Sequence, residues 1–436
     1  MSDDPKHPLP PDAVPTDEPL TLAASINLRT LRALLTNRSF VALLLGQWAS
    51  YTGDQFTLIA AIPVLDTLTG GNALVTAGVA IALALPQIIF GLVGGVLVDR
   101  LDRKVVMVGT DLIRGAAVVA LVFVADVRFV WVFYVVGVIV GTSGTLFFPA
   151  RAAALPAILP KRQLAAANAL LEAGFVLALI FGSGVAGVLV DQFGSAFAFA
   201  FDASTYIFSG LLILTMHVPK VANAPTGQSA AAVWQELREG LVYIWDTRAM
   251  RYIMGLSVVV AAGLGAVIIL VFEYLFKELG IDATGFGVVI ATLGVGIIGG
   301  GVLIQRLSRF LSTNRLVAIS LVINGLAVLG FIPNPPYQMV LLFAALIGFS
   351  VVVARAVLGT LTQAIPPDEL RGRVQGAFNL VFSAPLALAI GLAGLALEAV
   401  QDPHLVFGGT GVLLLVTAFL SLVLLRGIDE MIYRVD

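Results

Sequence analysis

Long hydrophobic runs, separated by short polar turns, fill the chain between residues 39 and 425. A run of about 20 apolar residues is long enough to cross a bilayer as an α-helix. Backbone that faces lipid has to be helical, because no water satisfies its polar groups there. We therefore predict an all-α membrane protein with twelve transmembrane helices, near residues 39–65, 74–98, 105–124, 129–150, 164–190, 196–216, 252–276, 285–304, 316–332, 338–360, 374–397 and 406–425.

The composition agrees with this pattern. Hydrophobic residues make up 59% of the chain and charged residues 12%, whereas about a quarter of the residues in a soluble domain are charged. The net charge of -2 gives no electrostatic reason to expect a nucleic-acid partner. The chain has no cysteine, and His7, His217 and His404 are far apart in sequence, so we expect no metal site and no cofactor.

One segment of the sequence occurs twice. GGVLVDRLDRK at residues 94–104 returns as GGVLIQRLSR at residues 300–309, an offset of 206 residues in a chain of 436. An offset near half of the length indicates two tandem copies of one unit. We therefore expect two pseudo-symmetric six-helix bundles.

Basic residues gather on one side of the predicted topology. The two tails and the loops that follow even-numbered spans contain most of the 25 lysines and arginines. The opposite loops contain only Arg128 and Lys277. Because basic loops stay in the cytoplasm, we predict a multi-pass protein of the cell membrane with both termini cytoplasmic.

The region between the two copies is predicted to be a tether. Trp234, Leu237, Leu241 and Ile244 follow a helical spacing, which is typical of an amphipathic helix at the cytoplasmic interface. A partner-binding surface is the alternative. The predicted divisions are a disordered cytoplasmic tail at 1–35, a first bundle at 36–217, the linker at 218–251, a second bundle at 252–426 and a cytoplasmic tail at 427–436.

The repeated segment resembles the loop between helices 2 and 3 of the major facilitator superfamily. Residues 35–55, 149–174 and 368–376 resemble one branch of it, which contains enterobactin exporters and macrolide-efflux proteins. The resemblance implies a secondary transporter whose central cavity opens alternately to each side. The residues that match the loop are Gly95, Asp99, Arg100, Arg103 and Lys104, whereas Asp102 stands where the family usually has glycine.

Four residues of this loop, Asp99, Arg100, Arg103 and Lys104, are candidate gating residues. In the family, the matching aspartate locks the two halves together on the cytoplasmic side, which implies the outward-open state. A helix amino terminus can hold such an anion, and residues 366–370 offer one at the start of span eleven. A solvated basic loop that only fixes the topology is the alternative.

Two arginines occupy near-equivalent positions in the two copies, Arg151 at the end of span four and Arg355 within span ten. Arg151 is close enough to the interface to reach water, and we expect it to act in gating with Asp99. Arg355 lies deeper, so we expect it to pair with an acid or with backbone carbonyls. A substrate contact is the alternative for both arginines.

Asp54 and Gln55 lie about fifteen residues into the first span, near the middle of the bilayer. A charge at that depth costs about 2.5 to 3.5 kcal/mol, so each one needs a reason to be there. Burial favours the neutral carboxyl group, which suits proton exchange, and the resemblance implies that this span lines the cavity. We expect Asp54 to bind a proton or a cationic substrate; a fixed hydrogen bond that shapes the span is the alternative.

Other charged residues also lie inside predicted spans. Asp111 and Arg114 are three residues apart on span three, which indicates a structural ion pair. Glu172 in span five and Asp202 in span six are candidates for a second proton-coupling carboxylate. The segment GSGVAG at residues 182–187 differs in two positions from the export signature of the family's antiporters, so it predicts close helix packing more surely than export.

The function that these features favour is proton-coupled export of an amphipathic small molecule, such as a drug or a siderophore, by a monomer in the lipid bilayer. A lipid or lysolipid flippase, or an uptake carrier of the same fold, is the alternative. A sensor without transport activity is disfavoured by Asp54 and by the intact Asp99 loop. We do not expect an enzyme, since no combination of nucleophile and base is recognisable.

The Asp99 loop yields a first prediction. Asp99→Asn should weaken the outward-facing state and raise the labelling of single cysteines on the cytoplasmic side. Gln305 stands at the equivalent place in the second copy, so Gln305→Asn serves as the control and should leave that labelling unchanged. If cytoplasmic labelling is the same in Asp99→Asn as in the parent, the loop does not act as a lock.

Overall fold

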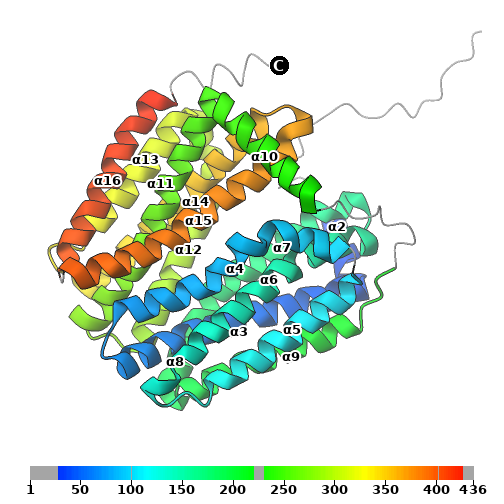
Figure 1. Cartoon of the computed structure of the whole chain (residues 1–436), viewed down its shortest axis with the longest axis horizontal. Helices are drawn as coiled ribbons and strands as arrows, with labels where there is room; N and C mark the ends of the chain where they lie inside the picture. The colour runs from blue at the N-terminus through cyan, green and yellow to red at the C-terminus, as the bar shows by residue number, and fades with distance from the viewer. Residues whose placement is uncertain (1–27, 100, 220–229, 401, 426–436) are drawn as a thin grey trace, which may run out of the picture.

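Helices form every regular element that the computed structural model describes, which covers residues 28–99, 101–219, 230–400 and 402–425. This agrees with the all-α class expected from the hydropathy pattern. Figure 1 shows the helices in two groups, one built from the first half of the chain and one from the second half. α4 of the first group and α15 of the second run side by side where the groups meet.

The first group contains eight α-helices and three short segments in the described residues. α7, a π-helical segment and α8 follow one another without a break and together correspond to the predicted fifth span. The α-helices are α2 Leu28–Thr36, α3 Arg38–Thr69, α4 Ala73–Asp99, α5 Arg103–Leu121, α6 Trp131–Ile158, α7 Leu164–Leu177, α8 Ser183–Phe193 and α9 Ser195–Leu214; the short segments are Val127–Phe129, Lys161–Gln163 and the π-helical Ala178–Gly182.

The second group begins with α10, which lies across the ends of other helices (Figure 1). It corresponds to the helix predicted within the linker. The elements are α10 Ala230–Asp246, α11 Arg248–Glu273 with a π-helical extension Tyr274–Glu278, α12 Ala283–Phe310, α13 Thr313–Leu329, α14 Tyr337–Ala364, α15 Asp368–Val400 and α16 Pro403–Leu424.

Nine of the helical stretches in the described residues are long and apolar enough to cross a membrane. Three helices at predicted spans fall short of that criterion. α13 has only 17 residues, α5 contains Asp111 and Arg114, and the middle of α3 contains Asp54 and several other polar residues. Among the helices at predicted spans of the first half, the two least apolar are thus those with charges near their centres.

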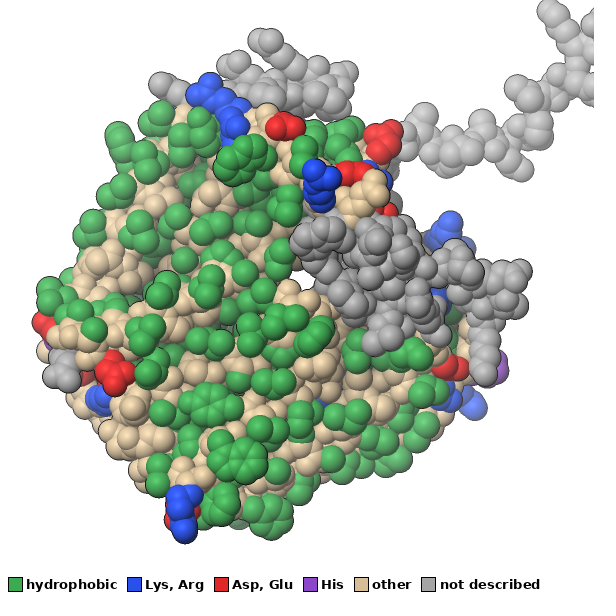
Figure 2. Space-filling model, viewed as in Figure 1, with side chains coloured by type: hydrophobic (Ala, Val, Ile, Leu, Met, Phe, Trp, Pro, Cys, Tyr) green, Lys and Arg blue, Asp and Glu red, His purple; other side chains and the backbone are tan. Residues whose placement is uncertain are grey.

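Charged side chains lie mainly near the two ends of the helices on the face seen in Figure 2, and hydrophobic side chains cover the surface between them. Many large hydrophobic side chains of the described residues are exposed, such as Phe419 and Val302. A soluble protein rarely exposes such a large apolar surface. In a membrane protein, lipid covers such a surface, so contact with the bilayer explains both the exposed apolar side chains and the apolar spans.

The two groups of helices touch at the end opposite α10. α4 and α15 pack through small residues there: a β-carbon added to Gly394 would lie 2.9 Å from Ala77 Cβ, and one added to Gly391 would lie 2.7 Å from Ile81 Cδ1. α8 and α12 also pack together at this end. We call it the closed end and the opposite one, which carries α10, the α10 end.

Close helix packing on α12 gives a stability prediction. A β-carbon added to Gly296 would lie 2.0 Å from the carbonyl oxygen of Ala345 on α14, whereas one added to Gly299 meets nothing within 4 Å. Overpacking of a tight contact costs about 1 to 3 kcal/mol. Gly296→Ala should therefore lower the melting temperature in detergent by several degrees, and the control Gly299→Ala should not. Equal melting temperatures for the two variants would contradict this packing.

Candidate functional site

Two glycines let α3 and α9 approach closely. A β-carbon added to Gly46 would lie 2.9 Å from Ser209 Oγ, and one added to Gly53 would lie 2.1 Å from Thr205 Oγ1. Residues seven positions apart lie on the same face of a helix, so both glycines face α9. We call this contact the α3–α9 seam; its members are Gly46, Gly53, Asp54 and Thr57 on α3 and Asp202, Thr205, Tyr206 and Ser209 on α9.

Asp54 lies in the seam and is bound by a tyrosine of α9. The hydroxyl group of Tyr206 donates a hydrogen bond to Asp54 Oδ1 at 2.5 Å. Tyr206 is buried, whereas Asp54 is partly exposed. Its neighbour Gln55 is buried, and Gln55 Oε1 has no hydrogen-bond partner among the described residues. Asp54 is therefore the seam carboxylate that retains some access to its surroundings.

Asp111 and Arg114 form the ion pair that their spacing predicted. Arg114 Nη2 lies 2.8 Å from Asp111 Oδ1, and both side chains are buried. Ser209 of the seam donates a hydrogen bond to Asp111 Oδ2 at 2.7 Å. The Arg114 guanidinium also lies 4.8 Å from the ring centroids of Phe147 and Tyr206. The pair thus connects α5 to the seam through Ser209 and Tyr206.

Asp202 is the most deeply placed carboxylate of the seam. Its exposed fraction is 1%, and it accepts hydrogen bonds from the hydroxyl groups of Thr57 and Thr205. Asp202, Tyr206 and Ser209 are spaced so that they share one face of α9. On that face, Tyr206 binds Asp54 and Ser209 binds Asp111. Three carboxylates and one guanidinium therefore meet where α3, α5 and α9 pack.

A second polar cluster surrounds Arg151 on α6. Arg151 Nη1 donates to the hydroxyl oxygen of Tyr51 at 3.1 Å and to Gln47 Oε1 at 3.4 Å. Arg151 Nη2 lies 3.4 Å from Glu172 Oε1 on α7, and the guanidinium lies 5.2 Å from the Phe148 ring centroid. The Arg151 cluster, as we call these five residues, is thus formed by α3, α6 and α7.

Glu172 is the exposed carboxylate of this cluster. It lies eight residues after the start of α7 at Leu164, which is about 12 Å along the helix axis, yet 65% of its side chain is exposed. A carboxylate at such depth faces water rather than lipid. Because α7 begins at the α10 end, we infer that water reaches Glu172 from that end.

The structure describes only part of the predicted gating loop. Arg103 Nη1 donates to the carbonyl oxygen of Ala153 at 2.8 Å, and Lys104 Nζ donates to the carbonyl oxygen of Met216 at 2.8 Å. These bonds tie the start of α5 to the ends of α6 and α9. α4 ends at Asp99, but the Asp99 side chain and Arg100 lie outside the described residues. The predicted lock between Asp99 and span eleven stays a prediction.

The partner of Arg355 differs from the one that we expected from its depth in the span. We expected an acid or a backbone carbonyl as its partner, but its guanidinium lies 5.0 Å from the Phe382 ring centroid and the residue is exposed. The neighbouring face of α15 presents an aromatic ring there, and the negative face of a ring attracts a cation. Arg151 and Arg355 thus share a ring contact, but only Arg151 also has a carboxylate beside it.

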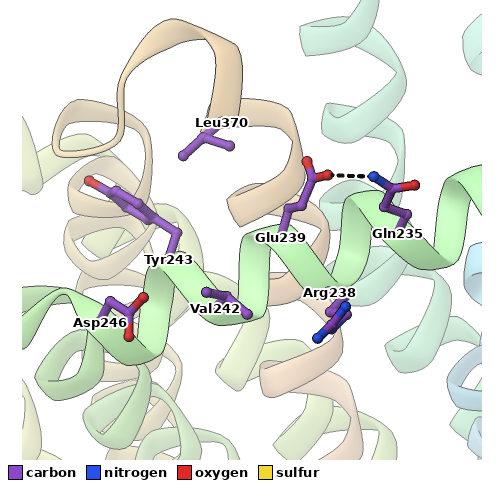
Figure 3. A pocket seen from close by; sticks show the side chains of 7 residues that line it. All are labelled: Gln235, Arg238, Glu239, Val242, Tyr243, Asp246 and Leu370. Atoms are coloured by element: carbon purple, nitrogen blue, oxygen red, sulfur yellow. Dashed lines mark hydrogen bonds between the residues drawn. The ribbon is translucent and has the colours of Figure 1, made fainter.

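A pocket of about 800 Å³ lies between α10 and the start of α15 (Figure 3). Glu239 and Tyr243 project from α10 toward the turn that carries Leu370. Glu239 binds Arg373 of α15, and the Tyr243 hydroxyl donates to the carbonyl oxygen of Ile365 at 3.5 Å. These contacts attach α10 to α15 and to the residue that follows α14. The pocket is lined by other residues than the seam and the Arg151 cluster.

A family model for transmembrane secretion effectors matches residues 30–433 of this chain. The chain belongs to this family. Its members are major facilitator transporters, so the predicted superfamily and the expectation of a transporter rather than an enzyme are confirmed. The match spans both groups of helices and identifies the protein as a multi-pass membrane transporter.

Relatives of similar length include two efflux proteins. The multidrug efflux pump Tap of Mycolicibacterium fortuitum is 28% identical over 87% of this chain and 97% of its own length. Macrolide efflux protein A of Streptococcus pyogenes is 25% identical over 83% of this chain and 89% of its own length. These relatives agree with the branch of efflux transporters that the sequence motifs indicated.

Solved structures show the same fold at low sequence identity. The nucleoside transporter NupG superposes with a TM-score of 0.69 at 14% identity and covers 89% of this chain and 99% of its own. A bacterial homologue of the lysosomal transporter Spinster gives a TM-score of 0.67 at 16% identity, covering 91% and 98%. At this identity the likeness supports the major facilitator fold and nothing finer.

The hydroxyl groups that bind these charged side chains were not predicted from the sequence. Tyr206 and Thr57 bind Asp54 and Asp202, and Tyr51 binds Arg151. One signal was available in the sixth span, where polar residues recur at positions 202, 206 and 209 on one helical face. The first span has the same spacing at positions 47, 51 and 54 and again at 50, 54 and 57, but spacing within one helix does not identify the partners on other helices.

The buried ion pair yields the prediction of this section. Arg114→Gln leaves Asp111 buried without its cation, which costs about 3 to 5 kcal/mol, so the melting temperature in detergent should fall strongly. The double variant Asp111→Asn with Arg114→Gln should recover most of that loss. Arg128→Gln is the control, because Arg128 and its partner Asp126 are both exposed. A double variant as unstable as Arg114→Gln would show that the ion pair is not the source of the loss.

Proposed function

We propose that the protein is a proton-coupled exporter that moves amphipathic small molecules out of the cytoplasm by alternating access. Two relatives named as a multidrug pump and a macrolide-efflux protein support both the direction and the substrate class. The observation that carries the proton coupling is the hydrogen bond between Tyr206 and Asp54. It holds a partly exposed carboxyl group inside a spanning helix, next to an otherwise buried charge cluster.

We infer that the structure represents an inward-open state. The positive-inside rule places the α10 end in the cytoplasm. The two groups of helices touch at the closed end, and the exposed Glu172 side chain lies toward the α10 end. In this proposal, substrate enters from the cytoplasm along α3, α6 and α7.

Asp54 is the proposed site of proton exchange. A carboxyl group in a dry helix contact favours the neutral form, and the same group ionises when water and a cation come within reach. Opening and closing of the two ends would change the water access of Asp54 and hence its proton occupancy. Asp202 and Glu172 are proposed as further proton-binding groups, Asp202 behind the seam and Glu172 in the Arg151 cluster.

The Arg151 cluster is proposed to contact substrate. Its charged pair lies beside aromatic rings, with Tyr51 and Phe175 in an edge-to-face arrangement at 5.5 Å. A site that combines apolar rings with a few charged groups suits a molecule with both apolar and polar parts. The exposed Glu172 carboxylate is the group that such a molecule meets when it enters from the α10 end.

Inside-out vesicles that are energised and contain a pH-sensitive dye test this proposal. Macrolides, tetracyclines, cationic dyes and catechol siderophores are added in turn. At least one class should dissipate the proton gradient in vesicles with the parent protein, and Asp54→Asn should reduce that signal by tenfold or more. Asp66→Asn is the matched control, because Asp66 lies on the same helix three residues before its end at Thr69.

Two results would count against the proposal. If Asp54→Asn and Asp66→Asn respond alike, the seam carboxylate does not couple protons to transport. If no compound moves protons while fluorescent lipid crosses the bilayer without a gradient, the protein moves lipid rather than drugs.

A further inference from the structure

The amino terminus of α12 is held by two carboxylates from different parts of the chain. Asp282 is the N-cap residue of α12 itself and accepts a hydrogen bond from Gly285 N at 2.8 Å. Asp191 comes from α8, in the other group of helices. It accepts from Ala283 N at 3.2 Å, from Thr284 N at 2.8 Å and from the Thr284 hydroxyl group.

The chemistry of the Asp191 contact is that of a charge at a helix end. The first backbone N–H groups of a helix have no partner within the helix, and the helix dipole places partial positive charge there. A carboxylate at this position makes charge-assisted hydrogen bonds, which are stronger than neutral ones. Asp282 already satisfies one N–H group, and Asp191 satisfies the two before it.

The contact depends on how closely α8 and α12 approach. A β-carbon added to Gly187 would lie 2.6 Å from the carbonyl oxygen of Ala283, and one added to Gly287 would lie 2.4 Å from the carbonyl oxygen of Ser183. The two backbones therefore touch one turn below Asp191. Any movement that separates α8 from α12 breaks the three hydrogen bonds to Asp191, while the bond to Asp282 remains.

We propose that Asp191 is a positioning residue of the transport cycle, a latch that holds the closed end shut in the inward-open state; this rests on the alternating access proposed above. The latch consists of Asp191 on one side and the backbone of Ala283 and Thr284 on the other. It joins the two groups of helices at an exposed site, outside the apolar contact below it. Opening of the closed end requires its release, so its strength sets the balance between the two states.

The test compares two carboxylates at one helix terminus. The chain has no cysteine, so a single introduced cysteine is its only thiol. Ala77→Cys reports on the closed end, because Ala77 is fully buried against α15 there. Asn168→Cys reports on the α10 end, because Asn168 is exposed on α7 one turn before Glu172. Each reporter is combined with Asp191→Ala or with Asp282→Ala and labelled with a membrane-impermeant maleimide that is added on the reporter's own side of the membrane.

Asp191→Ala should increase labelling at the Ala77→Cys reporter about three- to tenfold, as expected for a charge at a helix end. Labelling at the Asn168→Cys reporter should fall in the same variant. Asp282→Ala removes a carboxylate of the same type from the same terminus, but it breaks no contact between the groups. It should lower the melting temperature without changing the ratio of the two labels.

Two graded variants complete the design. Asp191→Asn keeps an acceptor but removes the charge, so it should shift the ratio less than Asp191→Ala does. Thr284→Val removes only the hydroxyl donor and should have the smallest effect. If Asp191→Ala leaves the ratio unchanged, or shifts it no more than Asp282→Ala does, the latch is wrong.

The labelling needs neither substrate nor a proton gradient. A shifted label ratio together with a failed vesicle assay would therefore keep the latch and reject proton-coupled export. An unchanged ratio together with a working vesicle assay would reject the latch alone.

Discussion

A charge inside a membrane persists only where other groups of the protein replace the water that it loses. This constraint explains the packing of the first half of the chain. α3 and α9 approach through Gly46 and Gly53. That approach lets Tyr206 of α9 bind Asp54 of α3 and lets Thr57 of α3 bind Asp202 of α9. Without the two glycines, the hydrogen bonds that keep Asp54 and Asp202 in the bundle could not form.

The two halves of the chain differ in where their charged side chains lie. Among the described residues, the buried carboxylates lie in the first half. Its helices α3 and α5 contain charged residues and are less apolar than the other spans of that half. The second half presents Arg355 beside an aromatic ring where the first half presents Arg151 beside Glu172. The two arginines thus lie at near-equivalent positions of the two copies, but their partners differ.

Hydropathy was enough to place the helices, since each predicted run overlaps a helix of the described residues, and the spacing of Asp111 and Arg114 identified a buried ion pair correctly. Hydropathy could not predict which side chains of different helices bind one another, such as Tyr206 with Asp54 and Asp191 with Thr284. In α10, Ile244 is buried against the protein, whereas Leu241 is exposed. α10 packs on α15 through Gly240 and Tyr243, a face that hydrophobic spacing did not reveal.

The π-helical segment Ala178–Gly182 sets the rotation of α8 relative to α7, so the number of residues in the fifth span matters for its contacts. It joins α7, which presents Glu172 to water, to α8, which presents Gly187 to α12. Each residue of an α-helix turns the chain by about 100°. Deletion of one residue from this segment would rotate all of α8 and carry Gly187 and Asp191 away from their contacts. A single-residue gap at this place would therefore disturb more of the interface than most substitutions within it.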